Sequence, residues 1–158
     1  MSQREVNGSQ YALSVLGPAR RIEWEGDFPA DLRTIVEPYF VPLEGLLPTW
    51  CQHVCLRYSA HETSTLKIEL SIRNRWALLR ICPGWLNAPA AERQDALIHE
   101  ICHALIEPFN WNVTRTLDAH APPEGSAGRN IIDNVVNDGL EQAVEDMARA
   151  FQKLLPAL

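Results

Sequence analysis

The sequence predicts an α+β fold in which a small antiparallel or mixed sheet packs against two helices. Three short runs with strand-like composition are gathered between residues 51 and 82. Two longer segments follow, at residues 88–107 and from residue 131 onward, and in each the apolar residues recur at intervals of three or four. Together the two patterns indicate one sheet and a pair of long helices.

Length, composition and charge favour a single domain without a nucleic-acid partner. The chain has 158 residues, 46% of them hydrophobic, which is enough for one core. We expect residues 1–20 to form a flexible lead-in and residues 21–158 to form the domain. The formal charge is −6 and no run of Lys or Arg is present, which argues against nucleic acid or an anionic membrane as the main partner.

The N-terminus and the cysteines indicate the compartment. The first ten residues are polar, the pattern of a signal peptide is absent, and no stretch reaches transmembrane length, so we expect a cytoplasmic protein. The four cysteines are too few for a disulfide scaffold and are expected to be free thiols. The spacing of Cys51, His53 and Cys55 is only a weak signal for a metal site, and alternating residues of a half-buried strand are the favoured interpretation. Cys102 is expected in the core.

The elements of the first half are expected in the following order. Residues 27–37 have the pattern of a short helix capped by Asp27 and ended by Pro38, and residues 39–49 form a connector. Strands are expected at residues 51–59, 65–72 and 75–82, arranged as a meander in which the last two form a hairpin around Asn74. The third strand directly precedes the next helix, which makes it a candidate edge of a cleft.

The second half is predicted to hold two helices joined by a long loop. The first helix spans residues 88–107, begins at Asn87 as a cap, and is ended by Pro108. Residues 109–129 contain two prolines and two glycines, and a long loop of this kind is often functional. An apolar stripe from Ile131 to Leu155 then predicts a C-terminal helix that Pro156 ends.

The first of these helices carries the most informative motif of the chain, His99-Glu100-Ile101-Cys102-His103. Two histidines four residues apart project from one face of a helix, so both rings can reach one Zn²⁺ ion. Glu100 lies beside them and can act as a general base toward a zinc-activated water. A shuffled chain of this composition would contain the motif in roughly 1% of cases. The motif therefore predicts a catalytic zinc ion.

A catalytic zinc site commonly has three protein ligands, so a third residue is needed. A third histidine six residues after His103 is absent, because position 109 is Phe. The remaining candidates lie downstream, and helical geometry favours Glu141, which borders the apolar stripe of the C-terminal helix. The competing interpretation is an acidic, solvated helix face, with Glu145 paired to Arg149. The full set of candidates is Asp118, His120, Asp133, Asp138, Glu141, Glu145 and Asp146.

The combination of His99-Glu100-x-x-His103 with Glu141-Gln-Ala-Val-Glu145 resembles the gluzincin branch of the zincin metallopeptidases, especially compact single-domain members. The resemblance covers roughly residues 65–155. It implies Glu141 as third zinc ligand, Glu145 as an acidic partner of a ligand, and an edge strand that aligns an extended substrate. Larger gluzincins usually carry Asn before the ligand and Asp four residues after it, where this chain has Leu140 and Glu145.

These observations predict a zinc-dependent metallopeptidase that hydrolyses peptide bonds with Glu100 as general base. The alternative is a non-catalytic metal-binding or assembly domain of zincin fold. The developing oxyanion needs a donor in addition to the metal, and the candidates by position are His120, Arg115 and Arg129 of the expected loop. The expected partners are a peptide or protein substrate and one zinc ion, without nucleic acid or membrane.

Overall fold

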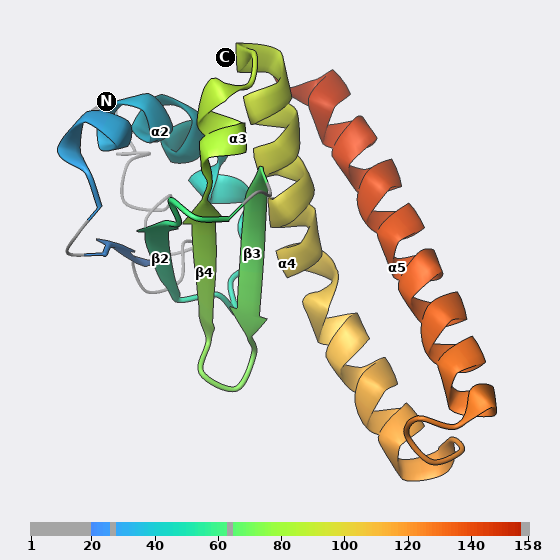
Figure 1. Ribbon diagram of the computed structural model, residues 1–158. Helices are drawn as coiled ribbons and strands as arrows, with labels where there is room; N and C mark the ends of the chain where they lie inside the picture. The colour runs from blue at the N-terminus through green and yellow to red at the C-terminus, as the bar shows by residue number, and fades with distance from the viewer. Residues whose placement is uncertain (1–19, 26–27, 63–64, 156–158) are drawn as a thin grey trace, which may run out of the picture.

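The computed structural model of the protein describes residues 20–25, 28–62 and 65–155. Within these residues the chain is α+β, with one mixed four-stranded sheet and helices packed on it (Figure 1). The predicted class is therefore confirmed. The elements are β1 (Arg21–Trp24), α2 (Ala30–Leu43), the 3₁₀ helix η1 (Glu44–Leu46), β2 (His53–Tyr58), β3 (Leu66–Ser71), β4 (Trp76–Ile81), α3 (Pro83–Asn87), α4 (Ala90–His120) and α5 (Ala127–Leu154).

The strand order of the sheet is β1-β2-β4-β3, so the expected meander is wrong. β2 pairs in parallel with both β1 and β4, and the hairpin of β3 and β4 forms as predicted, with Leu66 opposite Ile81. The most apolar strand takes the central place: four of the six residues of β4 are buried, but only one of β3. Consequently β3, and not the third predicted strand, forms the edge beside α4.

The core lies on one face of the sheet, under α2 and α4. Alternate residues of β2 and β4 point into it, because successive side chains of a strand face opposite sides. Val54 and Leu56 pair with Ala77 and Leu79 and are buried with them. The opposite face is polar and carries the ion pair of Arg57 with Glu25 and those of Arg80 with Glu62 and Glu69. The sheet therefore has one apolar face and one solvated face.

Helix α2 continues past Pro38, where the sequence predicted its end. Phe40 and Leu43, both beyond that proline, are buried in the core. Burying two side chains of this size stabilises by roughly 3–6 kcal/mol, which is of the same order as the cost of about 3 kcal/mol for each of the two prolines inside the helix, Pro38 and Pro42. The predicted cap Asp27 lies outside the described residues. The predicted connector of residues 39–49 contains η1, a single turn of 3₁₀ helix.

The motif helix α4 begins at Ala90, after a short helix α3 that the sequence analysis did not predict. Asn87 is the last residue of α3 and not a cap of α4, whose N-cap position is held by Pro89 without a side-chain hydrogen bond. Trp85 explains the extra turn, because its ring is buried in the core and its indole N–H donates to Arg93 O at 2.9 Å. The segment is thus anchored by tertiary contacts.

Helix α4 does not end at Pro108 but runs on to His120. A proline within a helix leaves the carbonyl four residues earlier without its N–H partner, here the carbonyl of Ala104. That oxygen accepts a hydrogen bond from the indole N–H of Trp50 at 3.1 Å. Because Ala104 is fully buried, an unpaired carbonyl there would be costly. The side chain of Trp50 therefore replaces the missing backbone donor.

The long loop expected at residues 109–129 is wrong, since only residues 121–126 separate α4 from α5. Ser126 caps α5 by accepting a hydrogen bond from the N–H of Arg129 at 3.2 Å. The buried guanidinium of Arg129 bridges Asp118 of α4 at 2.8 Å and Asp133 of α5 at 2.7 Å. These contacts fix a tight helical hairpin.

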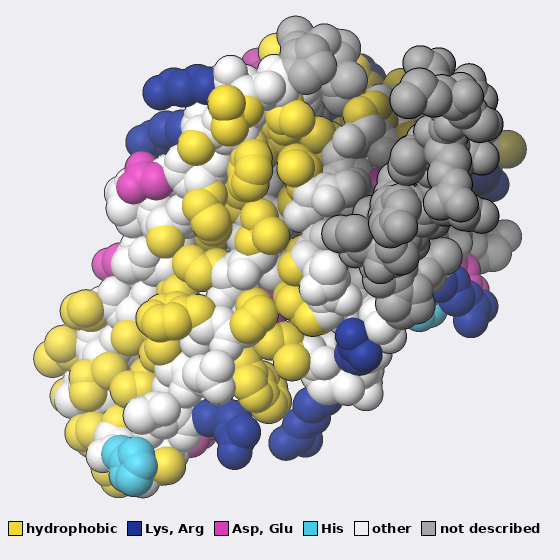
Figure 2. Space-filling view, turned by 180° about the vertical axis from the view of Figure 1, so that it is seen from behind, with side chains coloured by type: hydrophobic (Ala, Val, Ile, Leu, Met, Phe, Trp, Pro, Cys, Tyr) yellow, Lys and Arg dark blue, Asp and Glu magenta, His cyan; other side chains and the backbone are white. Residues whose placement is uncertain are grey.

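The far half of this hairpin extends beyond the sheet (Figure 1). The predicted apolar stripe of α5 is consequently buried only in part: Val144 is fully buried, but Ile131 and Val135 are 65% and 66% exposed. Figure 2 shows hydrophobic side chains gathered along the back of the molecule, over this hairpin. α5 ends at Leu154, two residues before Pro156, as predicted.

The beginning of the described chain is held firmly. The guanidinium of Arg20 donates hydrogen bonds to four backbone carbonyls, those of Glu44, Leu47, Pro48 and Cys51. Residues 1–19, where the flexible lead-in was predicted, lie outside the described part. No described helix combines the length and the hydropathy that crossing a membrane requires.

Candidate metal centre

The candidate site forms where α4 faces α5. His99, Glu100 and His103 lie on the first half of α4, whose other face carries the buried residues Ile98 and Ile101. Glu141 projects from α5 toward the two histidines. Helical spacing explains the arrangement, because residues four apart share a face of α4 and that face meets α5.

The ligand atoms of three residues converge. His99 Nε2 and His103 Nε2 are 3.1 Å apart, and the two rings meet edge to face at a centroid distance of 4.9 Å. In the carboxylate of Glu141, Oε2 lies 3.9 Å from His99 Nε2 and Oε1 lies 3.7 Å from His103 Nε2. All three ligand atoms lie within 4.8 Å of one another, and no other such metal-ligand group occurs within the described residues.

These distances fit a zinc ion. Zinc binds imidazole nitrogen at about 2.0–2.1 Å and carboxylate oxygen at about 2.0–2.2 Å, so tetrahedral ligand atoms lie about 3.3–3.5 Å apart. The two nitrogens are 3.1 Å apart, and with one Glu141 oxygen included the three ligand atoms lie within 4.8 Å of one another, which is somewhat wider than that value. Two imidazoles and one carboxylate are also a donor set found in catalytic zinc sites. A rotation of the Glu141 side chain toward the two histidines would bring one of its oxygens into the coordination range.

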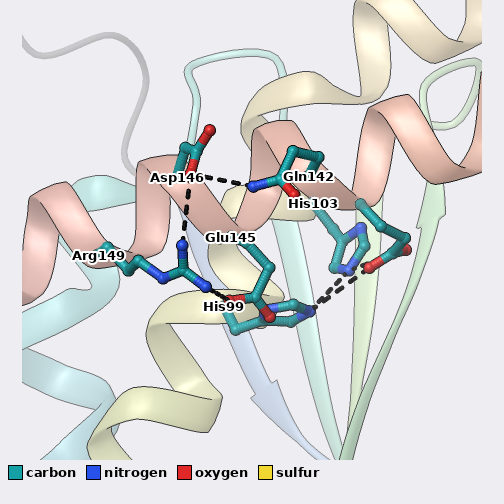
Figure 3. Close-up of polar contacts among 7 residues, drawn as sticks. His99, His103, Gln142, Glu145, Asp146 and Arg149 are labelled. Atoms are coloured by element: carbon teal, nitrogen blue, oxygen red, sulfur yellow. Dashed lines mark hydrogen bonds and ion pairs between the residues drawn. The ribbon is translucent and has the colours of Figure 1, made fainter.

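A second acidic residue of α5, Glu145, contacts the far side of His99. Its Oε1 lies 3.4 Å from His99 Nδ1, so the other ring nitrogen, Nε2, is directed toward Glu141 and His103. This places Glu145 where a carboxylate orients a ligand histidine from behind. The contact belongs to a chain along α5: Arg149 lies 3.5 Å from Glu145 and 3.6 Å from Asp146, which accepts from Gln142 (Figure 3).

Burial keeps His103 in the form that binds metals. Its pKa is lowered mainly by burial and further by the neighbouring His99, while Glu141 opposes the shift. A lowered pKa means that the ring is neutral at neutral pH. A neutral imidazole has a lone pair available for a cation.

Glu100 is half-buried between α4 and the edge strand. Its Oε2 accepts a hydrogen bond from the backbone N–H of Ile68 in β3 at 2.9 Å. Burial raises the pKa of Glu100 to about 7; the charge of Glu141 adds to the shift, and the Ile68 hydrogen bond and Lys67 reduce it. A carboxyl group with a pKa near neutrality can both accept and return a proton.

Two grooves meet at Glu100. One, of about 440 Å³, runs toward the start of β3 and the end of α5 and is lined by residues that include Thr65, His99, Glu145 and Arg149. The other, of about 400 Å³, runs along β3 in the opposite direction and is lined by Lys67, Ile68, Leu70, Glu100, His103 and Glu107. Glu100 is common to both, so the candidate metal centre is open on two sides.

The residues predicted to assist from the loop are not near the site. His120 is the last residue of α4, seventeen positions after His103, which corresponds to about 25 Å along a helix. Arg115 lies about 18 Å beyond His103 by the same rise, and Arg129 is engaged by Asp118 and Asp133. The assignment of these three was wrong because the region is helical and carries them away from α4's first half.

The cysteines form no second centre within the described residues. All four are free thiols, as predicted, and Cys102 is buried in the core. His53 pairs instead with Glu23 at 3.1 Å. Cys51 is buried and Cys55 is half-buried on the polar face of β2. The fold therefore supports the interpretation of Cys51, His53 and Cys55 as structural residues and not as a metal site.

Sequence reasoning missed the contribution of β3. The Ile68 amide and the groove residue Lys67 had no signal in the sequence, because their position depends on which strand is the edge. The meander prediction placed the wrong strand there. Only the strand order brings these groups to Glu100.

Comparison with family models, with curated proteins and with solved structures returns no match for this chain. The interpretation of the site therefore depends on its own geometry and chemistry.

Proposed function

We propose that the protein is a zinc-dependent metallopeptidase of the zincin type. The observation that carries the proposal is the convergence of His99, His103 and Glu141 from two helices, with Glu100 beside them where two grooves meet. The gluzincin resemblance adds support, because the residues that it implies as ligands are the ones that lie together. Glu145 behind His99 fits its implied role as well.

The three ligand residues would hold one zinc ion with a position left for water. The chemistry that a bound zinc ion supplies is polarisation of the peptide carbonyl and of the attacking water. Glu145 keeps Nδ1 of His99 occupied, so that Nε2 faces the ion. Neutral His103 offers its lone pair without losing a proton first.

The remaining steps belong to Glu100. Its carboxylate accepts a proton from the water as the water oxygen bonds to the carbonyl carbon of the substrate. The same group then donates that proton to the nitrogen of the scissile bond as the carbon–nitrogen bond breaks. The products are a new carboxyl terminus and a new amine terminus. A positioned acid–base group of this kind contributes typically 10²–10⁴-fold to the rate.

The substrate that fits the grooves is an extended polypeptide. β3 has six residues and is therefore about 20 Å long, and it borders the site as an edge strand. An edge strand has unpaired backbone groups that can pair with a further strand. Because the grooves extend to both sides of Glu100, a chain can pass through the site and be cut at an internal bond.

The test uses the zinc-loaded protein and a mixture of dodecapeptides with acetylated N-termini and amidated C-termini. We expect internal cleavage, detected by mass spectrometry. Glu100→Gln should lower kcat/KM by roughly 100-fold or more with unchanged zinc content, because the proton acceptor is lost while the ligands stay. The matched control is Glu124→Gln, an exposed carboxylate in the turn between α4 and α5, which should behave like the wild type.

Two results would contradict the proposal. A zinc-loaded wild-type protein that cleaves no peptide would favour the non-catalytic metal-binding or assembly domain. A Glu100→Gln variant with full activity would show that the hydrolysis uses another group.

A further inference from the structure

The hydrogen bond between β3 and Glu100 is an unusual use of a strand amide. In an antiparallel pair, alternate residues face the partner strand. The N–H of Cys82 donates to Thr65 O at 3.3 Å. The backbone groups of Thr65, and with them those of Lys67 and Glu69, therefore point toward β4. The backbone N–H and C=O groups of Ile68 face away from β4. Its amide points out of the sheet, and Glu100 of α4 accepts its hydrogen bond.

We propose that the backbone N–H of Ile68 is the positioning group of Glu100, holding one carboxylate oxygen against β3 so that the other is presented to the reacting water. This inference rests on the proposed function, because Glu100 needs a fixed orientation only if it transfers a proton there.

Among the described residues, the anchor of the Glu100 side chain is the amide of Ile68. Within the described part of the chain, the 2.9 Å contact from the Ile68 N–H to Oε2 is the one hydrogen bond that this carboxylate makes. The side chain lies where the two grooves meet, so solvent and substrate reach it from both sides. A glutamate has three rotatable side-chain bonds, and without the contact its carboxylate would sample several rotamers. One charge-assisted hydrogen bond from a rigid strand removes that freedom.

The contact joins two elements that the fold already holds together. β3 is fixed by its pairing with β4, and α4 packs on β3. Neither partner of the hydrogen bond therefore has to be ordered when substrate binds. Placement within about 1 Å matters at this point, since a misplacement of that size can lower a catalytic rate by about 100-fold.

The first experiment measures amide hydrogen exchange by NMR in the zinc-loaded protein, without substrate. We expect the Ile68 amide to exchange about tenfold more slowly than the Leu70 amide, each relative to its intrinsic rate. Both amides point away from β4, and of the two only that of Ile68 has an acceptor among the described residues. Glu100→Ala should abolish this protection. Glu100→Gln should keep it, since the amide oxygen of Gln still accepts. Amides of β4 report whether the fold is unchanged.

The second experiment removes the donor. Ile68→Pro deletes an N–H that takes no part in the sheet, and an outward position of an edge strand is one that tolerates proline. We expect kcat to fall by roughly 10- to 100-fold with zinc affinity unchanged. Ile68→Ala shortens the side chain but keeps the amide, so the kcat of Ile68→Pro should lie roughly tenfold or more below that of Ile68→Ala, whatever the loss of side-chain packing does to both. This pair separates the backbone donor from the packing of the side chain.

The outcomes are distinguishable. Equal Ile68 exchange in the wild type and in Glu100→Ala overturns the contact itself, whether or not Ile68→Pro folds. A folded Ile68→Pro with the kcat of the wild type overturns the positioning role and leaves the peptidase proposal intact. A wild type without any peptidase activity contradicts the proposed function and this role together, even if the exchange pattern is as expected.

Discussion

The side chains of the two histidines are oriented by carboxylates of α5. His99 is held between Glu141 on one ring nitrogen and Glu145 on the other, and His103 meets the same Glu141 at 3.7 Å. The two glutamates thus lie four residues apart on α5 but contact different atoms of His99. This difference predicts different consequences when either carboxylate is removed.

Glu141→Ala should weaken zinc binding more than Glu145→Ala does. Loss of Glu145 removes only the group behind His99, which typically costs 10–100-fold in metal affinity. Loss of Glu141 removes an atom that would bind the ion itself, so the decrease should exceed that range. Competition with a chromophoric zinc chelator measures both. If Glu141→Ala binds zinc as tightly as the wild type, Glu141 is not a ligand.

At the scale of residues, the sequence predicted three side chains that the structure brings together, and their binding of zinc stays a prediction. The spacing of His99 and His103 requires only a helix, and Glu141 followed from the wheel of the second helix. His120 could not be judged in the same way, because its distance from the site depends on whether residues 109–120 are helical. That in turn depends on a hydrogen bond from Trp50, which is far away in sequence.

At the scale of elements, proline is the main reason that boundaries were predicted wrongly. Pro38 and Pro108 both lie inside helices. In α2 the burial of Phe40 and Leu43 helps to offset the cost, and in α4 Trp50 supplies a donor to the Ala104 carbonyl. A local sequence pattern indicates neither of these stabilising contacts, because both are made with residues outside the helical turn that contains the proline.

A double-mutant cycle tests the explanation for α4. Trp50→Phe should lower the free energy of unfolding by roughly 1–3 kcal/mol, because it leaves the buried Ala104 carbonyl without a donor. In the Pro108→Ala background the N–H of residue 108 can donate to that carbonyl, so the same Trp50→Phe change should cost less than half as much. Urea unfolding of the four proteins measures the difference. Equal costs in both backgrounds would mean that Trp50 acts only by packing.

The order of the strands in the sheet was also not predictable from local sequence patterns. The three strands from 51 to 82 were located nearly to the residue, and their hairpin formed as predicted. The order of the strands in the sheet was predicted wrongly. It depends on the high apolar content of β4, which favours an inner place in the sheet, and on β1, a four-residue strand without a clear sequence pattern. Because β4 takes an inner place, β3 lies at the edge of the sheet, where it lines the grooves.

At the scale of the whole molecule, the polar face of the sheet adds a pH-dependent term to stability. Hydrogen bonds from Arg57 and Arg80 lower the pKa of Glu25 and Glu62, respectively. In the unfolded chain these carboxyl groups regain their ordinary pKa, so the unfolded state binds more protons near pH 4. The stabilisation is therefore present above about pH 4.5 and is lost as the pH falls through the lowered values.

The double variant Arg57→Gln/Arg80→Gln should consequently be less stable than the wild type at about pH 6, with the gap closing as the pH falls toward about 3. Thermal unfolding followed by circular dichroism at several pH values measures this. Arg115→Gln serves as the control, because Arg115 is exposed and makes no ion pair within the described residues. A gap that stays constant over this range would contradict the assigned pairs.

The same view of the molecule explains why the site lies where it does. α4 packs against the sheet edge on one side and against α5 on the other, so a single helix brings Glu100 to β3 and the histidines to Glu141. The far half of the hairpin takes no part in this arrangement. The central claim of the account is that this meeting point binds zinc.

Diffraction at the zinc absorption edge tests that claim most directly. Crystals of the wild-type protein with one equivalent of zinc should show a single strong anomalous peak within about 2.2 Å of His99 Nε2, His103 Nε2 and a carboxylate oxygen of Glu141. Zinc bound at other residues, or no peak between α4 and α5, would contradict it.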